Sequence, residues 1–462
     1  MQRSTIEGDM ISHSALFKRP DAGIHTVILV ALSSASLILS VPVLAQDHKY
    51  PTASELGLMQ GFPPPPDKQV TKANALQKAP FNRWSYQRMR MFYPSANVPA
   101  ADKPVPVSKS IDWKFGDGVK VKEPGTGAAK SLADWLKETW TDALVVIRGD
   151  QVVYETYFNG MHPNQPHQLM SVTKSFGGLL GLMAVEEGRL KESDPVTKYV
   201  PELKKAGAFA DATFGQVLDM TNSMDFTEDY ADPRSGIRTY GAVLGWTTKV
   251  DGVRYQNSLY EYLVTLGIDK KHRHGEIFHY QTPKTDVVNW VTNRVNNQSF
   301  QEALYEKVWS AIGTEGETYV LLDNNATLVA GGGLNATPYN LARFAMMMLN
   351  DGNFNGRQVV PASVVKKLAR GGSIDAFDKG PDSDDVVHRK SEWSYRAQWW
   401  VKHTKGMEAF MAIGIHGQWI YIDRNHDVAI VKVSSMPPSK DEYLDGYNLQ
   451  GFYGIIEYLS AK

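Results

Sequence analysis

The stretch Leu-Met-Ser-Val-Thr-Lys-Ser-Phe, residues 169–176, decides how this chain folds and what chemistry it performs. Ser171 and Lys174 are three residues apart, a spacing that places two side chains on the same face of a helix. The amine can therefore approach the hydroxyl without help from distant sequence. This pair predicts a serine nucleophile beside a lysine, although so short a pattern also arises by chance.

The residues that follow predict a buried helix. Positions 177–185 carry no charge before Glu186, and Gly188 offers a helix stop. Burial weakens the preference of Lys174 for its charged form and makes it a proton acceptor near neutral pH. We therefore expect Ser171 and Lys174 to act as one catalytic unit.

The first 45 residues have the pattern of a secretory signal. Lys18 and Arg19 precede an uncharged, mostly apolar stretch at 26–45, and polar residues follow at 46–49. The stretch is long enough to span a membrane, but its small final residue favours cleavage. We expect residues 1–45 to be a signal peptide and the protein to be exported, periplasmic or secreted, without stable membrane association once cleaved.

Composition narrows the classes of function. The chain has no cysteine, which excludes disulfides, a cysteine nucleophile and zinc-thiolate sites. The formal net charge is −1 and 42% of residues are hydrophobic, which favours a globular enzyme without a nucleic-acid partner. His272 and His274 have basic neighbours and no acidic ligand cluster, so we expect no metal and no cofactor. Composition leaves the oligomeric state open.

Three regions follow from the pattern along the chain. Residues 46–114 carry four consecutive prolines at 63–66 and no sustained periodicity, which predicts an extended arm. Residues 115–462 form the main domain, with a mostly helical insertion at about 175–390.

Strand and helix patterns divide this domain. Two hairpins are expected, with strands at 143–147 and 151–158, and at 418–422 and 428–433. Helical patterns lie at 286–294, 301–312, 340–349 and 447–459. Strands at both ends with helices between them predict an α+β fold whose antiparallel sheet joins the N- and C-terminal segments, flanked by helices.

Two further stretches carry candidate catalytic groups. Tyr280 follows an apolar run and precedes a helix, and a tyrosine beside a positive charge can carry a proton to a leaving group. Glycines at 414 and 417 precede a strong strand and let substrate approach the backbone closely. We expect the Gln418 amide and the Ser171 backbone amide to stabilise an oxyanion. His416 has either a structural role or a direct one in proton transfer.

Taken in order, three motifs resemble those of the serine β-lactamase-like, penicillin-recognising hydrolases. They are Ser171-Val172-Thr173-Lys174, Tyr280-Gln281-Thr282 and His416-Gly417-Gln418. The resemblance covers about residues 115–460 and favours the class C-like esterases and the 6-aminohexanoate-dimer hydrolase branch. It implies that Ser171 is acylated, that Lys174 and Tyr280 move its proton and later activate water, and that the site lies between a sheet and a helical domain.

Departures from the family pattern bear on the substrate. The second motif ends in Thr282 where the family has asparagine, and Ile415-His416-Gly417 replaces Lys-Thr-Gly. In true β-lactamases and peptidases the third motif helps to hold the substrate carboxylate. Its missing lysine argues against efficient β-lactam recognition and favours an ester or a linear amide.

The resemblance also implies substrate contacts. Residues 228–233 resemble a substrate-contacting segment of the aminohexanoate-oligomer branch, so Tyr230 is assigned to substrate binding together with His416 and Gly417. Trp399 and Trp400 are adjacent on a strand and point to opposite faces, so at most one lines the pocket, and we assign Trp399 to it.

The leading hypothesis is an exported serine hydrolase that cleaves a small-molecule carboxylic amide or ester through an acyl-enzyme. Alternatives are a carboxylesterase, and a β-lactamase or D-alanyl-D-alanine peptidase. A catalytically inactive, penicillin-binding-like sensor is the non-enzymatic alternative. The intact serine, lysine and tyrosine argue against the sensor, because a binding module needs no such set.

Overall fold

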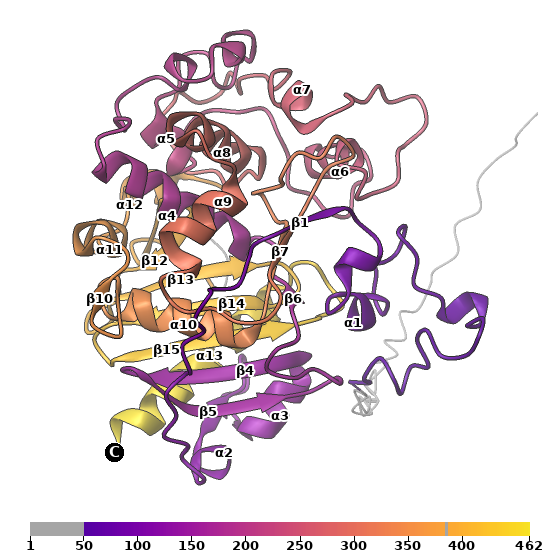
Figure 1. Ribbon diagram of the computed structural model, residues 1–462, viewed down its shortest axis with the longest axis vertical. Coiled ribbons are helices and arrows are strands. Elements are labelled where there is room, and N and C mark those ends of the chain that lie inside the picture. Colours follow the sequence, from indigo (N-terminus) through magenta and orange to yellow (C-terminus); the bar gives the residue numbers. More distant parts are fainter. Residues whose placement is uncertain (1–49, 384–386) are drawn as a thin grey trace, which may run out of the picture. The chain divides into compact units, whose positions relative to one another are not determined.

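Strand β4 (Thr141–Arg148) pairs with β15 (Val428–Ser434) and so joins early and late parts of the chain in one sheet. The computed structural model describes residues 50–383 and 387–462 (Figure 1), which all belong to one compact unit. The expected signal peptide, residues 1–45, lies outside the described residues. The pairing of β4 with β15 joins the two expected hairpins side by side in one sheet.

The central sheet has seven antiparallel strands. In spatial order they are β11 (Trp393–Arg396), β12 (Trp399–Lys402), β13 (Ala409–Gly414), β14 (Gln418–Asp423), β15, β4 and β5 (Gln151–Tyr157). A smaller sheet has the order β1 (Ser95–Asn97), β7 (Tyr319–Leu321), β8 (Leu334–Ala336) and β6 (His167–Gln168). Two ribbons pair β2 (Lys120–Lys122) with β3 (Ala129–Ser131), and β9 (Asn353–Phe354) with β10 (Arg357–Gln358).

The described residues also form thirteen α-helices. They are α1 (Asn82–Ser85), α2 (Phe115–Gly118), α3 (Leu132–Glu138), α4 (Val172–Glu186), α5 (Phe214–Leu218), α6 (Gly236–Val243), α7 (Leu259–Leu263), α8 (Pro283–Asn296), α9 (Phe300–Leu304), α10 (Pro338–Leu349), α11 (Ala362–Ala369), α12 (Ile374–Lys379) and α13 (Glu442–Ser460). Short 3-10 turns lie at Pro66–Lys68, Met89–Met91, Val196–Lys198 and Pro201–Lys205, and a π-helical turn lies at Tyr305–Trp309. The expected helix at 301–312 is thus α9 followed by a π-helical turn.

Both faces of the central sheet are covered by helices, which explains its continuous apolar strands. Val145 and Ile147 of β4 pack in the core that includes α4 and α10, whereas Leu144 and Val146 pack with α13 and α3 on the other face. Alternate side chains of a strand point to opposite faces, so a strand buried on both sides is apolar throughout. This arrangement confirms the predicted α+β fold, with helices between the strands of the two chain ends.

The N-terminal arm differs from its prediction. Instead of an extended segment, residues 50–114 fold into short turns and α1, and β1 adds to the smaller sheet. Leu76, Tyr86 and Tyr93 are buried in the same core as α4. The sequence did not predict this packing. The buried apolar residues of the arm lie singly along an irregular, proline-containing backbone, so they show neither a helical nor a strand periodicity.

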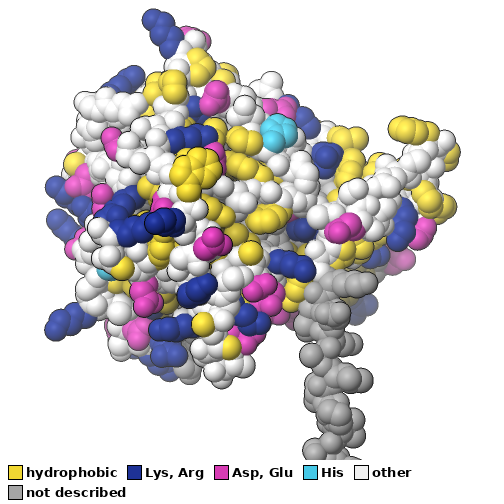
Figure 2. Space-filling model, turned by 90° about the horizontal axis from the view of Figure 1, so that it is seen from below, with side chains coloured by type: hydrophobic (Ala, Val, Ile, Leu, Met, Phe, Trp, Pro, Cys, Tyr) yellow, Lys and Arg dark blue, Asp and Glu magenta, His cyan; other side chains and the backbone are white. Residues whose placement is uncertain are grey.

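The molecular surface carries mixed charge. On the face in Figure 2, basic and acidic side chains are interspersed rather than gathered by sign. Within the part of the chain that the structure describes, no helix has both the length and the apolar character needed to cross a bilayer.

Two neighbouring glycines of α4 give a stability test. A Cβ at Gly178 would overlap the carbonyl oxygen of Ala397, whereas a Cβ at Gly177 would lie 3.8 Å from Thr285 Cγ2, an ordinary contact. We expect Gly178→Ala to destabilise the fold by roughly 1–3 kcal/mol through overpacking. Gly177→Ala is expected to be neutral or stabilising by up to about 1 kcal/mol.

Urea midpoints followed by tryptophan fluorescence measure both variants against the parent protein. Equal midpoints for the two alanine variants would contradict the close packing of α4 against the turn between β11 and β12.

Candidate active site

A sharp turn delivers Ser171 to the start of α4. Met170 adopts a left-handed conformation with φ 48°, and the chain passes there from β6 into the helix. The Thr173 hydroxyl donates to the Met170 carbonyl at 2.7 Å and accepts from the Leu334 amide at 3.0 Å. Strand β8 thus fixes the turn, and Ser171 lies at the N-terminus of a buried helix.

Lys174 contacts the Ser171 hydroxyl directly. Its Nζ donates to Ser171 Oγ at 2.8 Å and to the Gly331 carbonyl at 2.5 Å, and the side chain is 1% exposed. Burial lowers the pKa of Lys174 to about 8, although the Glu228 and Asp286 carboxyl groups oppose that shift. A substantial fraction of the amine is therefore neutral near physiological pH and able to accept a proton.

Asp286 of α8 positions the carbonyl that Lys174 binds. Its Oδ1 accepts from the Gly331 amide at 3.0 Å, and its Oδ2 accepts from the Tyr240 hydroxyl at 2.7 Å. Burial raises the pKa of this carboxyl group to about 7. The sequence analysis did not identify Asp286 as a site residue. Asp286 was visible only as a charged residue within the predicted helix at 286–294, and the sequence pattern did not show that its side chain points inward.

Tyr280 completes the cluster around Ser171. Its side chain lines a cavity together with Ser171, and Lys174 Nζ lies 5.2 Å from the centre of its ring. The ring stacks on Trp400 with centroids 5.5 Å apart. Burial, reinforced by Glu228, raises the pKa of Tyr280 well above its ordinary value. The phenol therefore stays protonated and has a proton to donate.

Tyr230 lines the same two cavities as Ser171, and its expected role in substrate binding stays a prediction. Its hydroxyl donates to Glu228 Oε2 at 3.0 Å, and Glu228 Oε1 accepts from the Thr282 amide at 2.5 Å. Glu228 therefore links Tyr230 to the second motif. Burial raises the pKa of Glu228, while Lys174 opposes that effect.

Two cavities meet at Ser171, Tyr230 and Ile415. The first, here called the arm-side cavity, is lined by these three residues with Leu76, Gln77, Met170, Lys174, Ile237, Tyr240, Gly241, Trp246, Thr247, Thr282, Gly331 and Gly332. The second, here called the Tyr280-side cavity, is lined by the same three residues with Glu228, Tyr280, Asp382, His388, Trp400, Ile413, Gly414, Ser439, Lys440 and Asp445. No group of three or more histidine and acidic side chains among the described residues could hold a metal ion.

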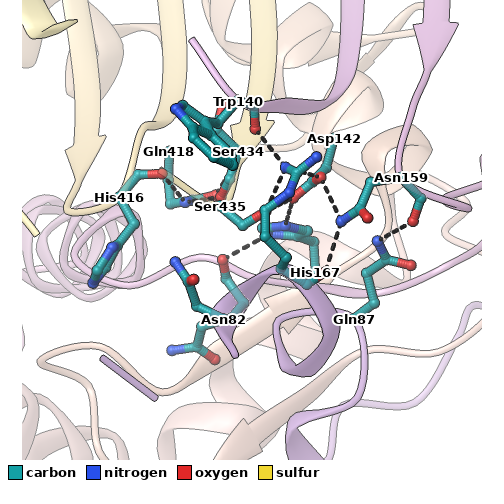
Figure 3. Close-up of polar contacts among 12 residues, drawn as sticks. Asn82, Gln87, Trp140, Asp142, Asn159, His167, His416, Gln418, Ser434 and Ser435 are labelled. Carbon is teal, nitrogen blue, oxygen red and sulfur yellow. Dashed lines mark hydrogen bonds and ion pairs between the residues drawn. The ribbon is translucent and has the colours of Figure 1, made fainter. Parts of the chain in front are cut away.

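The third motif is placed differently from its prediction (Figure 3). His416 is fully buried, and its Nδ1 lies 2.7 Å from the Met436 carbonyl. Burial lowers its pKa to about 4, which leaves the imidazole neutral. Gln418 Nε2 donates to the carbonyls of His416 at 3.0 Å and Ser434 at 2.6 Å. Both side chains are thus held by backbone carbonyls, and neither residue lines a cavity that contains Ser171. This corrects the substrate role of His416 and does not support the expected oxyanion role of the Gln418 backbone amide.

The glycine beside the nucleophile is Gly414 rather than Gly417. A Cβ at Gly414 would lie 2.6 Å from the Leu169 carbonyl and 3.1 Å from the Ser171 amide nitrogen. Gly417, with φ 85°, packs instead against Ser434 and Met436. The end of β13 is therefore the backbone that approaches Ser171, and Gly414 lines a cavity with Ser171, whereas Gly417 lines neither of the two cavities.

The structure reverses the positions predicted for Trp399 and Trp400. Trp399 is fully buried, donates from Nε1 to the Ser175 carbonyl at 3.0 Å and stacks on Phe344 of α10. Trp400 faces the opposite side of β12 and lines the Tyr280-side cavity. The alternation along the strand was predicted correctly, but Trp399 was the wrong member to assign to substrate.

Comparison with known proteins agrees with this geometry. A curated relative, the 6-aminohexanoate-dimer hydrolase of Paenarthrobacter ureafaciens, is 36% identical over 372 residues, which cover 80% of this chain and 89% of that protein. A solved structure described as "Putative 6-aminohexanoate-dimer hydrolase from Bacillus anthracis" superposes with a TM-score of 0.76 at 28% identity. It covers 86% of this chain and 99% of its own.

More distant structures share the fold. EstCE1, a hydrolase with promiscuous acyltransferase activity, has a TM-score of 0.53 at 16% identity and covers 70% of this chain and 98% of its own. The family model described as Beta-lactamase matches residues 132–451, more than half of the chain. The chain is therefore a hydrolase that belongs to the serine β-lactamase-like family.

Proposed function

We propose that this protein is an exported serine hydrolase that cleaves a carboxylic amide or ester through an acyl-serine intermediate. The observation that carries the proposal is the 2.8 Å contact between Lys174 Nζ and Ser171 Oγ in a buried site. A lysine that is partly neutral and in contact with a hydroxyl is the arrangement that activates a serine nucleophile.

In the acylation step, neutral Lys174 accepts the Ser171 proton while Oγ attacks the substrate carbonyl carbon. The resulting oxyanion needs backbone donors. We assign this role to the amides of Ser171 and Ile415, because Ile415 follows the glycine that packs on Ser171 and lines both cavities. Tyr280 donates its proton to the departing alcohol or amine and regains one from the Lys174 ammonium.

Deacylation reverses these roles. A water molecule takes the place of the leaving group and gives its proton to Tyr280 as it attacks the acyl carbon, while Tyr280 passes its own proton to neutral Lys174. Collapse of the second tetrahedral species transfers that proton from the Lys174 ammonium to Ser171 Oγ and frees the carboxylic acid. Both steps use the same three side chains, and the contact between Lys174 and Ser171 supports this proposal.

The substrate class rests on the relative and on the third motif. The curated relative is named for an amide-cleaving activity, which favours an amide here. The position of the family lysine is held by Ile415, whose side chain offers no charge to a substrate carboxylate. We therefore favour a linear amide or an ester over a β-lactam.

The nucleophile is tested with two serines of the same helical region. Ser171→Ala removes Oγ and is expected to reduce hydrolysis of p-nitrophenyl acetate to the rate without enzyme. Ser175→Ala is the matched control, because the Ser175 hydroxyl donates instead to the Gln398 carbonyl at 2.7 Å. It should retain turnover. Mass spectrometry should detect an acyl adduct on the parent protein and none on Ser171→Ala; undiminished turnover by Ser171→Ala would refute the proposal.

The pH dependence follows from the lowered pKa of Lys174. The base acts in its neutral form, so kcat/KM should rise about tenfold per pH unit below the Lys174 pKa of about 8 and level off above it. Lys174→Arg keeps the positive charge but cannot lose its proton in this range. We expect it to lose roughly 10²–10⁴-fold in kcat/KM. A pH-independent profile between pH 6 and 9 would contradict a lysine base.

We also propose that residues 1–45 direct export and are then removed. Expression of the full chain in a Gram-negative bacterium should yield periplasmic protein whose N-terminal sequence starts near Gln46. Replacing Lys18 and Arg19 by glutamate should leave uncleaved protein in the cytoplasm. Recovery of the intact N-terminus from the periplasmic fraction of the parent would show that the segment is retained.

A further inference from the structure

The N-terminal arm supplies part of the cavity next to the nucleophile. Leu76 and Gln77 line the arm-side cavity together with Met170, Ser171 and Lys174. Leu76 is only 4% exposed. Two arm residues therefore share a cavity with Ser171 although they precede it by more than 90 positions in the chain.

Specific bonds hold these two residues in place. The Tyr86 hydroxyl donates to the Leu76 carbonyl at 2.8 Å. Arg238 Nη1, on α6, donates to Gln77 Oε1 at 3.1 Å. The wall is thus attached both to the arm itself and to the helical region across the cavity.

The arm is in turn anchored to the strand that precedes Ser171. The Gln168 amide of β6 donates to the Tyr86 carbonyl at 2.8 Å. Arg83 is 4% exposed and donates to Asp142 Oδ1 at 2.9 Å, and Asp142 Oδ2 lies 3.0 Å from His167 Nε2 of the same strand (Figure 3). These buried contacts hold the wall in a defined position relative to the nucleophile.

The lining of the arm-side cavity indicates what it accepts. Leu76, Met170, Ile237 and Trp246 contribute apolar surface. Lys174 is the one basic side chain among the described lining residues, and none of them is acidic. A charged ammonium group would therefore lose solvation here without gaining a counter-ion.

The direction of the substrate follows from Tyr280. In the proposed mechanism Tyr280 protonates the leaving group, and Tyr280 lines the other cavity. The leaving alcohol or amine therefore occupies the Tyr280-side cavity. The acyl group extends into the arm-side cavity and meets Leu76 and Gln77.

We propose that Leu76 and Gln77 of the N-terminal arm are specificity-determining residues that close the acyl side of the site and select a short, uncharged acyl group. This inference rests on the proposed acyl-enzyme function and deepens it. It makes the arm part of the active site.

The test compares acyl chains on one leaving group. The full-length protein, Leu76→Ala and Leu76→Phe are assayed with p-nitrophenyl acetate, butyrate, hexanoate and octanoate. Truncation opens room for about two methylene groups, so the octanoate-to-acetate ratio of kcat/KM should rise about tenfold in Leu76→Ala and fall in Leu76→Phe. Leu58→Ala is the matched control, because Leu58 is also buried in the arm, 3% exposed, but lines neither cavity. Its ratio should match the parent.

Two further series separate the possible outcomes. Acetate esters of ethanol, phenol and benzyl alcohol should keep their relative kcat/KM in Leu76→Ala; a change confined to this series would overturn the acyl assignment. Hexanoyl anilide should be cleaved at least tenfold faster than 6-aminohexanoyl anilide, and the reverse preference would overturn selection for an uncharged acyl group. Unchanged acyl ratios in both Leu76 variants would overturn the role of the arm. Absence of Ser171-dependent turnover in the parent would instead overturn the proposed function itself.

Discussion

The desolvation of Lys174 is the constraint on which the rest of the site depends. An exposed lysine is an ammonium at neutral pH and offers no lone pair to a serine proton. Placing it in the first turn of an apolar helix lowers its pKa to about 8, but two nearby carboxyl groups limit that effect. Excessive burial would make the amine too weak a base, and a close ion pair would keep it charged. The observed balance leaves both protonation states accessible during one turnover.

Asp286 influences the Lys174 amine through the Gly331 backbone rather than by a direct bond. Its carboxyl group does not bond Lys174 but accepts from the Gly331 amide, so the Gly331 carbonyl turns toward the amine. The lysine thus receives a neutral acceptor in place of a full negative charge. A neutral carbonyl orients Nζ toward Ser171 without raising its pKa as strongly as a direct carboxylate would. The helix that follows the second motif therefore contributes both Tyr280 at its entrance and the support for Lys174.

The sequence predicted those parts of the fold and site that depend on local spacing. The Ser171–Lys174 pair, the buried helix and both hairpins follow from periods of 3.6 and 2. His416 and Trp399 were misassigned because a motif does not show which way a side chain points once strands pair. Asp286 and the packed arm were missed for a related reason. Their roles arise from contacts between segments distant in sequence, and no local pattern records such contacts.

The buried charge around Asp142 explains how a chain without cysteine holds its arm against the site. Arg83, His167, Asn159 and Ser435 come from four separate segments, and all bond this one carboxylate. Burying an ion pair adds little net stability compared with apolar packing, because desolvation offsets the attraction. Its geometry is nevertheless exacting, since a shifted arm would leave Asp142 without Arg83. A disulfide would fix one distance, whereas this cluster fixes the arm, β6 and the end of β15 together. Strand β6 leads directly into the turn that presents Ser171.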